Sequence, residues 1–594
     1  MSDLIVSANG PNLRPPHNSR KKPASKDASE AQASKALEKR PIFLALQGGG
    51  ARGIVHVGAL SAINDLQLEI KGVAGTSAGS IVAALIAAGY SGNDLLDEDL
   101  SNPTHLFDRL SSDQSPSDTA ATKPTAKKPT DLFSKAGWRW MRLIRRLSKP
   151  QHPAFTLTLA VSLIGAYAYL SFVLMTVHVL LGLAANLAAV GALVWGGFKL
   201  TKGLTTLNRV RNFVDRAIRH KLGTALEQNH DGSQLPLTFA DLKRARGIPL
   251  KIIATNTSSE SVEVFCAYKT PNVSIADAVA ASVCLPIIFK PWAIKFSRRN
   301  EKNEPDTHQF LDGGFVSNLP AWPFDEERLL HPEVPTIAMS IATPGARSKH
   351  WMSSIINTIV NGTAEIDTRA VGRFTKIPLS TDWGMLDFDK SFNEVYIQAL
   401  KAKQTTVKQL SNELIETPRV LRTAAQAILE DVSQAMSLYW GVLHSEIDLG
   451  GKIRVAIASP RSSSPGLMSL VSTSGYSRDL GYGAVLPTAH PGMAAWKDRQ
   501  PLLKRVDAGA IAFRPHLDDA QWILCVPLRP QEATNESPLK PCVVLIEFAI
   551  AFDLSIHSSH DHLSDMATCL AGIVNDYNES KGIATFVQGA NACI

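Results

Sequence analysis

The sequence predicts an α/β fold with a parallel sheet, followed by a smaller α+β unit. Short apolar runs alternate with helix-like apolar spacing between Pro41 and Ala342, which is the pattern of a parallel α/β sheet. A glycine-rich turn, Gly48–Gly53, separates the first strand from the first helix. From Ile453 onward the sequence pattern changes and predicts short strands separated by Gly- and Pro-rich segments. At 594 residues the chain is long enough for two or three domains.

The first unit reads as a regular alternation of elements. Pro41–Gln47 is a short apolar run typical of a buried strand, and Ile54–Leu68 has the apolar spacing of a helix. Lys71–Ala74 predicts a second strand, and Ala78–Tyr90 predicts an Ala- and Ile-rich buried helix. The expected elements that follow are strands at Ile248–Asn256, Val262–Ala267 and Thr336–Ala342 and a helix at Ala276–Val283.

The two ends of the chain differ from this pattern. Met1–Arg40 is rich in Ser, Lys, Ala and Pro and lacks the apolar core of a signal peptide, so we expect a disordered leader. Gln404–Met436 predicts a long helix. Strands at Ile453–Ala458, Trp522–Pro527 and Cys542–Phe548 and a closing helix at His560–Tyr577 then define a second unit, residues 405–594.

Composition excludes several classes of protein. Hydrophobic residues make up 45% and charged residues 19%, which excludes a chain that is mostly disordered, collagen-like or coiled coil. The 6 cysteines show no CxxC pairing and no dense spacing, so a disulfide scaffold and a structural zinc site are not expected. A reduced, cytosolic setting fits this usage, and no residue pattern calls for a metal.

The net charge of +7 hides a strong local asymmetry. Residues 123–149 carry a net +8 and residues 199–221 a net +6, while the rest of the chain carries a net −7. Between the two basic blocks, Pro150–Phe198 contains no Asp, Glu, Lys or Arg over 49 residues. About 20 apolar residues cross a bilayer, so this stretch predicts a two-helix transmembrane hairpin, about residues 154–199, with spans near Phe155–Leu174 and Leu180–Phe198.

The basic flanks indicate how such a hairpin is oriented. Lys and Arg flanking both outer ends favour a cytoplasmic location for those ends. The flanks are expected to meet anionic lipid head groups, and Leu204–Gln228 predicts an amphipathic basic helix suited to lying along a lipid surface. The alternative is a buried helical hairpin in a soluble core. Nucleic acid is not an expected partner, because the positive charge is local to the apolar stretch.

The glycine-rich turn Gly48–Gly53 brings backbone N–H groups close to an anion. It reads GGGARG and also satisfies G-x-G-x-x-G between a strand and a helix, so a dinucleotide site is one reading. Glu69 lies near the distance at which that motif places an acid. The same geometry serves a catalytic oxyanion equally well, because the helix N-terminus favours negative charge in both cases.

Ser77 lies in a second glycine-framed turn. Gly75-Thr76-Ser77-Ala78-Gly79 is a G-x-S-x-G between a predicted strand and a predicted buried helix. Flanking glycines relieve crowding there, so that the serine Oγ projects into a cleft as a nucleophile. The alternative is a serine that only caps the helix.

A serine nucleophile requires a base, and the third motif supplies a carboxylate. Asp312-Gly313-Gly314 is a turn sequence, and a plain β-turn is its simplest interpretation. His56 and His308 are the nearest candidate histidines, but neither stands in a comparable glycine-framed setting. A carboxylate held directly against Ser77 would act as the base of a two-residue dyad.

These three motifs, in this order, resemble the patatin-like phospholipases. GGGARG is similar to the glycine-rich oxyanion loop of that family, GTSAG to its nucleophile elbow and DGG to its aspartate box. Ala278–Pro286, continuing to Phe289–Pro291, is similar to the family's A-x-x-A-S-x-x-x-P block. The resemblance covers about residues 41–343. It implies a patatin-like α/β/α sandwich, residues 41–400, with an insertion at 94–229 that carries the hairpin.

The resemblance implies a role for each motif residue. Ser77 would attack the ester carbonyl, and Asp312 would act as general base and then as acid for the leaving alcohol. Backbone N–H groups of Gly49, Gly50 and Ala51 would stabilise the oxyanion. Arg52 is expected to brace the loop or to meet lipid phosphate. The supporting motif residues are Gly48, Arg52, Gly53, Gly75, Gly79, Gly313 and Gly314.

The second unit resembles a GAF sensor domain. Gly492–Pro501 is similar to a conserved stretch of that family, and it is followed by strands at suitable distances. GAF domains bind a small ligand or mediate dimers and regulate an attached domain, so a ligand or a dimer partner is implied here. The alternative is an unrelated α+β domain.

Together these features predict a membrane-anchored serine acyl hydrolase with a Ser-Asp dyad and no cofactor. Its expected substrate is a membrane phospholipid or lysophospholipid. Ser77 and Asp312 lie on either side of the hairpin in sequence and must meet, which requires an even number of spans. The catalytic domain would then face the cytoplasm, and a bacterial inner membrane is the expected location. The alternatives are a non-enzymatic membrane sensor or scaffold and a dinucleotide-binding enzyme at Gly48–Gly53.

Overall fold

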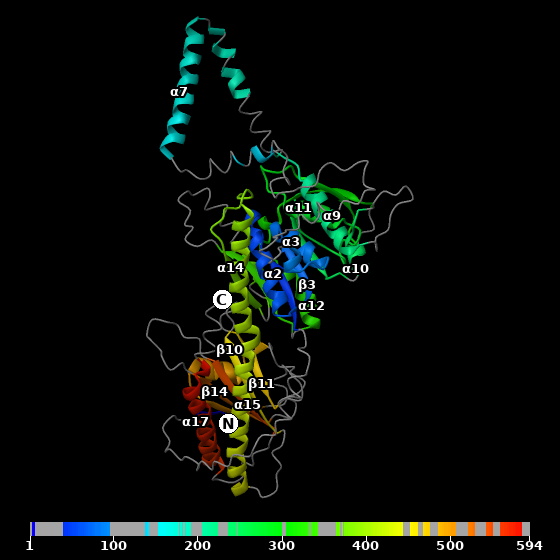
Figure 1. Ribbon diagram of the computed structural model, residues 1–594. Coiled ribbons are helices and arrows are strands. Elements are labelled where there is room, and N and C mark those ends of the chain that lie inside the picture. The colour runs from blue at the N-terminus through cyan, green and yellow to red at the C-terminus, as the bar shows by residue number, and fades with distance from the viewer. Residues whose placement is uncertain are drawn as a thin grey trace.

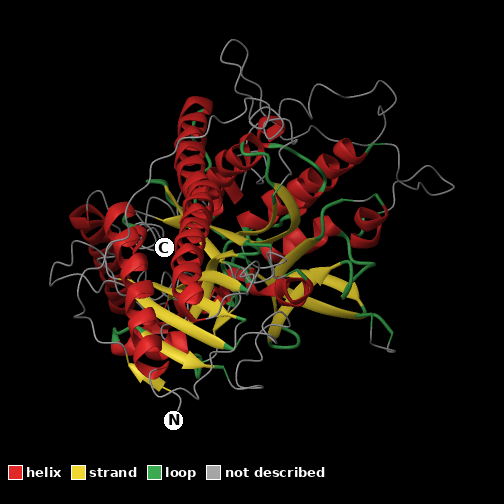
Figure 2. Ribbon diagram, turned by 90° about the horizontal axis from the view of Figure 1, so that it is seen from below, coloured by secondary structure: helices red, strands yellow, loops and turns green. Residues whose placement is uncertain are grey.

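The computed structural model contains two folded units that share one long helical connection (Figure 1). It describes residues 3–5, 40–95, 137–139, 142, 153–177, 179–180, 182–184, 186–191, 203, 205–223, 236–245, 247–299, 304–331, 334–342, 364–368, 371, 374–443, 452–460, 467–475, 485–486, 488–506, 521–528, 542–549 and 559–584. Each unit is built on its own sheet, and Figure 2 shows the strands of both sheets in yellow, seen from below.

The first unit contains an eight-stranded mixed sheet. Its order is β6-β7-β4-β3-β2-β8-β9, with β5 paired to β4. The strands are β2 Pro41–Leu46, β3 Glu69–Thr76, β4 Leu250–Asn256, β5 Ser261–Cys266, β6 Trp292–Phe296, β7 Asp306–Leu311, β8 Thr336–Ala342 and β9 Phe374–Ser380. β4, β3, β2, β8 and β9 are parallel neighbours. β5, β6 and β7 pair antiparallel, so the predicted parallel sheet is correct for its centre and wrong for one edge.

Strand β2 shows how the sheet separates two layers. Side chains alternate between the faces of a strand, so Ile42, Leu44 and Leu46 point to one face and Phe43 and Ala45 to the other. The first face packs on the main helical layer, and the second packs on the segment after β7. The helices of the unit are α2 Val55–Asp65, α3 Ala78–Ala87, α4 Gly92–Leu95, α9 Asn208–Leu222, α10 Phe239–Arg244, α11 Ile275–Ser282, α12 Asp325–Leu330 and α14 Phe392–Leu410, with 3-10 turns η1 Gly50–Ile54, η3 Gly313–Phe315 and η4 Trp322–Phe324.

Helix α9 corrects two predictions from the sequence. Its apolar stripe, Val210, Val214, Ala217 and Ile218, is buried in the core against α11 and α3 rather than available to lipid. Its charges also pair within the unit, as in the Arg211–Asp277 ion pair at 3.0 Å. Helix α9 therefore packs in the core of the first unit, while the bounds of the insertion, residues 94–229, stay a prediction.

The charge-free stretch forms helix α7, Pro153–Val177, followed by helical residues between 179 and 191. Among the residues that the structure describes, no helix is both long enough and apolar enough to cross a membrane. The two predicted spans are therefore not confirmed. Part of the second one, residues 192–198, lies outside the described residues, as do most of both basic flanks.

The second unit contains a seven-stranded antiparallel sheet of order β1-β13-β14-β15-β10-β11-β12. Its strands are β1 Asp3–Ile5, β10 Ile453–Pro460, β11 Met468–Ser474, β12 Val485–Leu486, β13 Leu502–Arg505, β14 Trp522–Leu528 and β15 Cys542–Phe548. Helices α15 Thr417–Leu443 and α17 Ser559–Lys581 cover one face, and α16 Pro491–Asp498 covers the other. β1 pairs with β13, so Asp3–Ile5 are a strand and not part of a disordered leader. The rest of the predicted leader lies outside the described residues.

The connection between the units is helical and not a loop. α14 passes through a π-helical turn, η5 Ser411–Glu416, directly into α15. Leu410 belongs to the first core and Leu421 to the second. The predicted boundary at residues 400–405 cuts α14, because helix spacing alone does not reveal where one core ends and the next begins.

Candidate active site

Ser77 stands at a sharp turn between β3 and α3. Its φ of 50° and ψ of −127° lie outside the ordinary regions for a residue with a side chain. The flanking glycines make this turn possible: a Cβ on Gly75 would lie 2.4 Å from the Gly79 oxygen, and one on Gly79 would lie 2.4 Å from the Leu46 oxygen. The G-x-S-x-G spacing is thus required by backbone packing around the serine.

Ser77 donates a hydrogen bond to Asp312. The distance from Oγ to Oδ2 is 2.7 Å, although the two residues are 235 positions apart in sequence. Both side chains are buried. Asp312 also accepts a hydrogen bond from the Gly314 amide at 2.8 Å, and its own amide donates to the Cys284 carbonyl at 2.8 Å. The carboxylate is therefore fixed against the serine by its own turn.

The environment of Asp312 favours a proton acceptor near neutral pH. Burial raises the pKa of Asp312 to about 6, and the hydrogen bonds from Gly314 and Ser77 limit the rise. Gly313 allows the turn to pack this closely, because a Cβ there would lie 2.2 Å from the Ile253 oxygen. A base with a pKa just below 7 is deprotonated at neutral pH and still accepts a proton readily.

The histidines considered from the sequence lie elsewhere. His56 is buried and contacts the Gln47 carbonyl through Nε2 at 2.8 Å, and burial lowers the pKa of His56 to about 4. His308 lies 3.3 Å from Asn256. Among the described residues, Asp312 is the titratable partner of Ser77.

The glycine loop lies beside the nucleophile. A Cβ on Gly48 would lie 2.9 Å from the Ser77 Cβ, and one on Gly53 would lie 2.8 Å from the Ala78 Cβ. Arg52 donates from Nε to the Gly49 carbonyl at 3.2 Å, so it braces the loop as the sequence suggested. The loop therefore faces the position that an ester bound at Ser77 would occupy.

One of the three expected oxyanion donors is already engaged. The Ala51 amide donates to the Met385 carbonyl at 2.8 Å. Gly50, with a φ of +60°, packs so tightly on this carbonyl that a Cβ would lie 2.3 Å from it. Neither the Gly49 nor the Gly50 amide has a hydrogen-bond acceptor among the described residues. The Ala51 amide is therefore engaged in this structure, and the oxyanion role expected for the three amides stays a prediction.

The register of the sheet disfavours a dinucleotide site. β2 and β3 run parallel, with Leu46 opposite Gly75 and Pro41 opposite Glu69. The glycine loop follows the Leu46 end of β2, so Glu69 lies at the opposite edge of the sheet, where it pairs with Lys71 at 2.6 Å. A ribose-binding acid must stand at the same edge as the glycine loop.

Two buried side chains that the sequence did not mark as functional support the site. Ser282 accepts a hydrogen bond from the Ser77 amide at 2.9 Å and donates to the Ile253 carbonyl at 2.6 Å. Asp367 accepts from the Leu319 amide at 2.9 Å, and burial raises the pKa of Asp367 to about 6. The A-x-x-A-S motif could have pointed to Ser282. No pattern pointed to Asp367, which follows the nearest motif by about 50 residues.

Comparison with known proteins agrees with this geometry. The model of the family "Patatin-like phospholipase" matches residues 44–325. Residues 44–325 form a patatin-like phospholipase domain. The matched segment contains Ser77, Asp312, the glycine loop and Ser282. The charge-free stretch, residues 150–198, lies within it, and the second unit lies outside it.

Individual relatives match the chain over short segments. "Lysophospholipase NTE1" of Yarrowia lipolytica is 44% identical over 57 residues, which are 10% of this chain and 4% of that protein. The chain thus spans a small part of the length of such relatives. The crystal structure of VipD from Legionella pneumophila shares 18% identity, with a TM-score of 0.28 over 63% of this chain and 67% of that one. Family match and relatives together support a lipid acyl hydrolase.

The second unit has a weaker counterpart. The GAF domain from an Acinetobacter phosphoenolpyruvate-protein phosphotransferase covers 27% of this chain and 93% of its own, at 12% identity and a TM-score of 0.15. These values do not assign the unit, and its GAF-like character stays a prediction.

Proposed function

We propose that the protein is a membrane-associated serine acyl hydrolase that cleaves acyl esters of phospholipids or lysophospholipids. The hydrogen bond of 2.7 Å between Ser77 and Asp312, formed at a strained turn beside the glycine loop, is the observation that carries the proposal. The ester substrate class follows from the patatin-like phospholipase domain and from the lysophospholipase relatives.

The reaction uses the residues in a fixed order. Ser77 Oγ attacks the ester carbonyl while its proton passes to Asp312 Oδ2, and the amides of Gly49 and Gly50 stabilise the oxyanion. Collapse of this intermediate breaks the bond to the alcohol, which takes the proton from Asp312. A water molecule then gives a proton to Asp312 and attacks the acyl-serine, which releases the fatty acid and returns the proton to Ser77.

Substitution at the dyad tests the mechanism. Ser77→Ala should abolish fatty acid release from phosphatidylcholine vesicles and from lysophosphatidylcholine, and it should abolish labelling by a fluorophosphonate probe. Ser61→Ala, which loses a hydrogen bond to Asn93 at the contact of α2 with α4, is the control and should retain both. Undiminished release by Ser77→Ala would refute the mechanism. If the wild-type protein is neither active nor labelled, the alternative of a non-enzymatic sensor gains support.

We also propose that the charge-free stretch embeds in lipid. Large apolar side chains of α7 are exposed, among them Ile164 at 68%, Tyr169 at 72% and Phe172 at 66%. In water such a surface is unfavourable, and a contiguous apolar surface of this kind marks a membrane or protein contact. The flanking basic blocks favour an anionic lipid surface as the partner.

A polar contact joins α7 to the helical residues after it. Asn186 accepts a hydrogen bond from the Tyr167 hydroxyl at 2.7 Å and donates one to Ser171 at 2.8 Å. Gly182 lies against Met175, where a Cβ would approach the Met175 Cγ to 2.2 Å. A polar contact and a close glycine contact between helices with exposed apolar side chains are typical of helix packing in lipid.

We propose a topology for such a hairpin. The outer ends of the hairpin and the catalytic domain share the cytoplasmic face of a bacterial inner membrane. Replacing residues 150–198 with a short Gly-Ser linker should move the protein from the membrane fraction to the soluble fraction, and the hydrolysis of a soluble ester should continue. Retention on membranes after carbonate washing would contradict the hairpin as the main anchor.

The second unit is proposed as a regulator of the first. Its sheet carries α15, which continues through η5 into α14 of the catalytic unit. A small-molecule ligand or a dimer partner on this unit is the expected input. Comparing the activity of the full chain with that of a chain ending at residue 411 tests the regulation, since a regulator predicts a change in the rate on a soluble ester and a passive domain predicts none.

A further inference from the structure

The loop between α11 and β6 contains an exposed residue with an unusual backbone. Ile287 has a φ of +72° and is 56% exposed. A positive φ is costly for a β-branched side chain, because Cβ crowds the backbone there. A strained conformation of this kind persists only where its surroundings hold it, and such residues cluster at functional sites.

The loop begins at the catalytic machinery. Ser282, the last residue of α11, holds the Ser77 amide at 2.9 Å. Two residues later the Cys284 carbonyl accepts the Asp312 amide at 2.8 Å. The nucleophile and its base are thus both fixed by residues that lead directly into the strained segment.

The other end of the loop forms hydrogen bonds with Thr205, which precedes α9 in the sequence. The Thr205 amide donates to the Ile288 carbonyl at 3.0 Å, and the Lys290 amide donates to the Thr205 carbonyl at 2.9 Å. Gly203, with a φ of +77°, packs so tightly on Phe289 that a Cβ would lie 2.3 Å from the Phe289 oxygen. The loop therefore packs against residues 203 and 205, which lie between α7 and α9 in the sequence.

Exposed lysines follow this apolar residue in the sequence. Lys290 lies at the end of the same loop and Lys295 lies on β6, and both are exposed. An exposed apolar side chain with a lysine three residues further along the same loop complements the acyl region and the phosphate region of an anionic lipid surface.

We propose that residues 285–290 form the lipid-facing edge of the active site, with Ile287 inserted among the acyl chains of an anionic phospholipid surface. This inference rests on the proposed function and adds to it: it names the surface through which an ester leaves the bilayer for Ser77. The strained backbone holds Ile287 outward in water, and the lysines hold the edge at the head groups.

Kinetics on two substrates test the edge. Ile287→Asp should lower the rate on anionic phospholipid vesicles at least tenfold and leave the rate on a soluble short-chain ester within twofold. Aspartate tolerates a positive φ better than isoleucine, so the backbone is not strained further. Leu329→Asp is the matched control, because Leu329 is 83% exposed on α12, and it should change neither rate. Equal losses on both substrates, or no loss on vesicles, would overturn the inference.

A fluorescence measurement tests insertion without relying on catalysis. An environment-sensitive fluorophore is attached to Ile287→Cys, in a chain in which Cys569 and Cys593 are replaced by Ser. Its emission should rise on addition of anionic vesicles and be quenched by lipids with a spin label in the acyl chain. The same fluorophore at Leu329→Cys should not respond. An unresponsive label at position 287 would overturn the inference, whereas a responsive label on an inactive protein would refute only the proposed function.

Discussion

The rate of acylation should depend on the carboxyl of Asp312 between pH 5 and pH 7. Burial raises the pKa of Asp312 to about 6, from an ordinary value of 3.8. Only the carboxylate accepts the Ser77 proton. With this pKa, roughly nine tenths of the molecules carry the carboxylate at pH 7 and roughly one tenth at pH 5. The acylation rate should therefore fall about tenfold from pH 7 to pH 5.

The assay is a single-turnover measurement with a soluble nitrophenyl ester, so that the binding of lipid does not contribute. Protonation of Asp312 does not unfold the protein, so unfolding at this residue would not explain a fall in the acylation rate at pH 5. Because the folded pKa exceeds the unfolded value, this carboxyl contributes stability that is fully present below about pH 4 and lost as the pH rises through about 6. Lowering the pH to 5 therefore strengthens the fold at this group while it removes the base.

Two other carboxyls have pKa values raised into the same range, and they serve as controls. Burial raises the pKa of Asp367 to about 6 and that of Glu413 to about 7. Asp367→Asn and Glu413→Gln should each retain the midpoint near pH 6 in the acylation rate. A rate that is constant between pH 5 and pH 7, or a midpoint that vanishes in Asp367→Asn, would refute Asp312 as the base.

Two further substitutions test the packing that holds the site. Ser282→Ala leaves the Ser77 amide and a strand carbonyl without their partner, so it should cost about 1–3 kcal/mol of stability and slow fluorophosphonate labelling about tenfold or more; a normal labelling rate would deny Ser282 a positioning role. Gly58→Ala places a Cβ 1.9 Å from the Ala399 oxygen, so it should destabilise the contact of α2 with α14 by about 1–3 kcal/mol in thermal unfolding. Gly572→Ala, with nothing within 4 Å of its Cβ, should be neutral or slightly stabilising, and equal effects of the two would contradict the packing argument.

Local patterns in the sequence were sufficient for the centre of the catalytic unit. β2 and α3 occur almost where the apolar spacing placed them, because they are buried and regular. The motif residues Ser77 and Asp312 meet as the order of the motifs implied. The glycine spacing predicted these turns correctly, because a side chain at the glycine positions would clash with the neighbouring backbone.

Features that depend on distant partners were not predictable in this way. The amphipathic pattern of α9 shows an apolar stripe but not whether protein or lipid covers it, and the α11 surface that covers it lies about 60 residues away. The hydrogen bond of the Ala51 amide was unpredictable for the same reason, since its acceptor Met385 lies more than 300 residues further along. Asp367 is buried only through the folding of the turn after Asp312, and no pattern in its own neighbourhood marks it.

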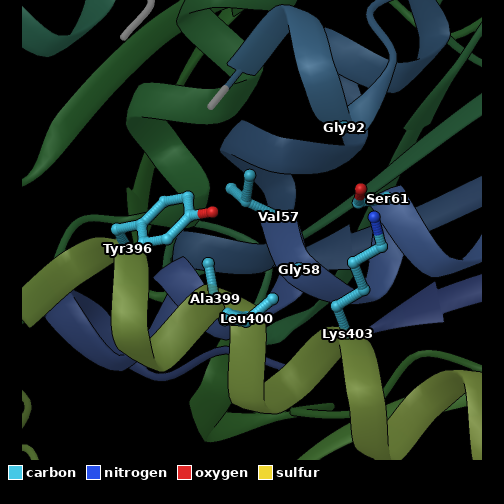
Figure 3. Close-up of a pocket in the computed structure, with 8 residues that line it drawn as sticks. All are labelled: Val57, Gly58, Ser61, Gly92, Tyr396, Ala399, Leu400 and Lys403. Atoms are coloured by element: carbon cyan, nitrogen blue, oxygen red, sulfur yellow. The ribbon is translucent and has the colours of Figure 1, made fainter. Parts of the chain in front are cut away.

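The unbroken helix between the two units has a mechanical consequence. α14 lies against α2 at Gly58, and the close-up of a small pocket along this seam shows Ala399 and Lys403 facing Gly58 and Ser61 (Figure 3). Because α14, η5 and α15 form one continuous helix, a rotation of α15 in the second unit would also rotate α14 at its contact with α2, unless the π-helical turn η5 changes conformation. Helix α14 begins only seven residues after Met385, whose carbonyl accepts a hydrogen bond from the Ala51 amide. A rotation of α14 that moves Met385 would thus release the Ala51 amide, which could then donate a hydrogen bond to an oxyanion beside Ser77.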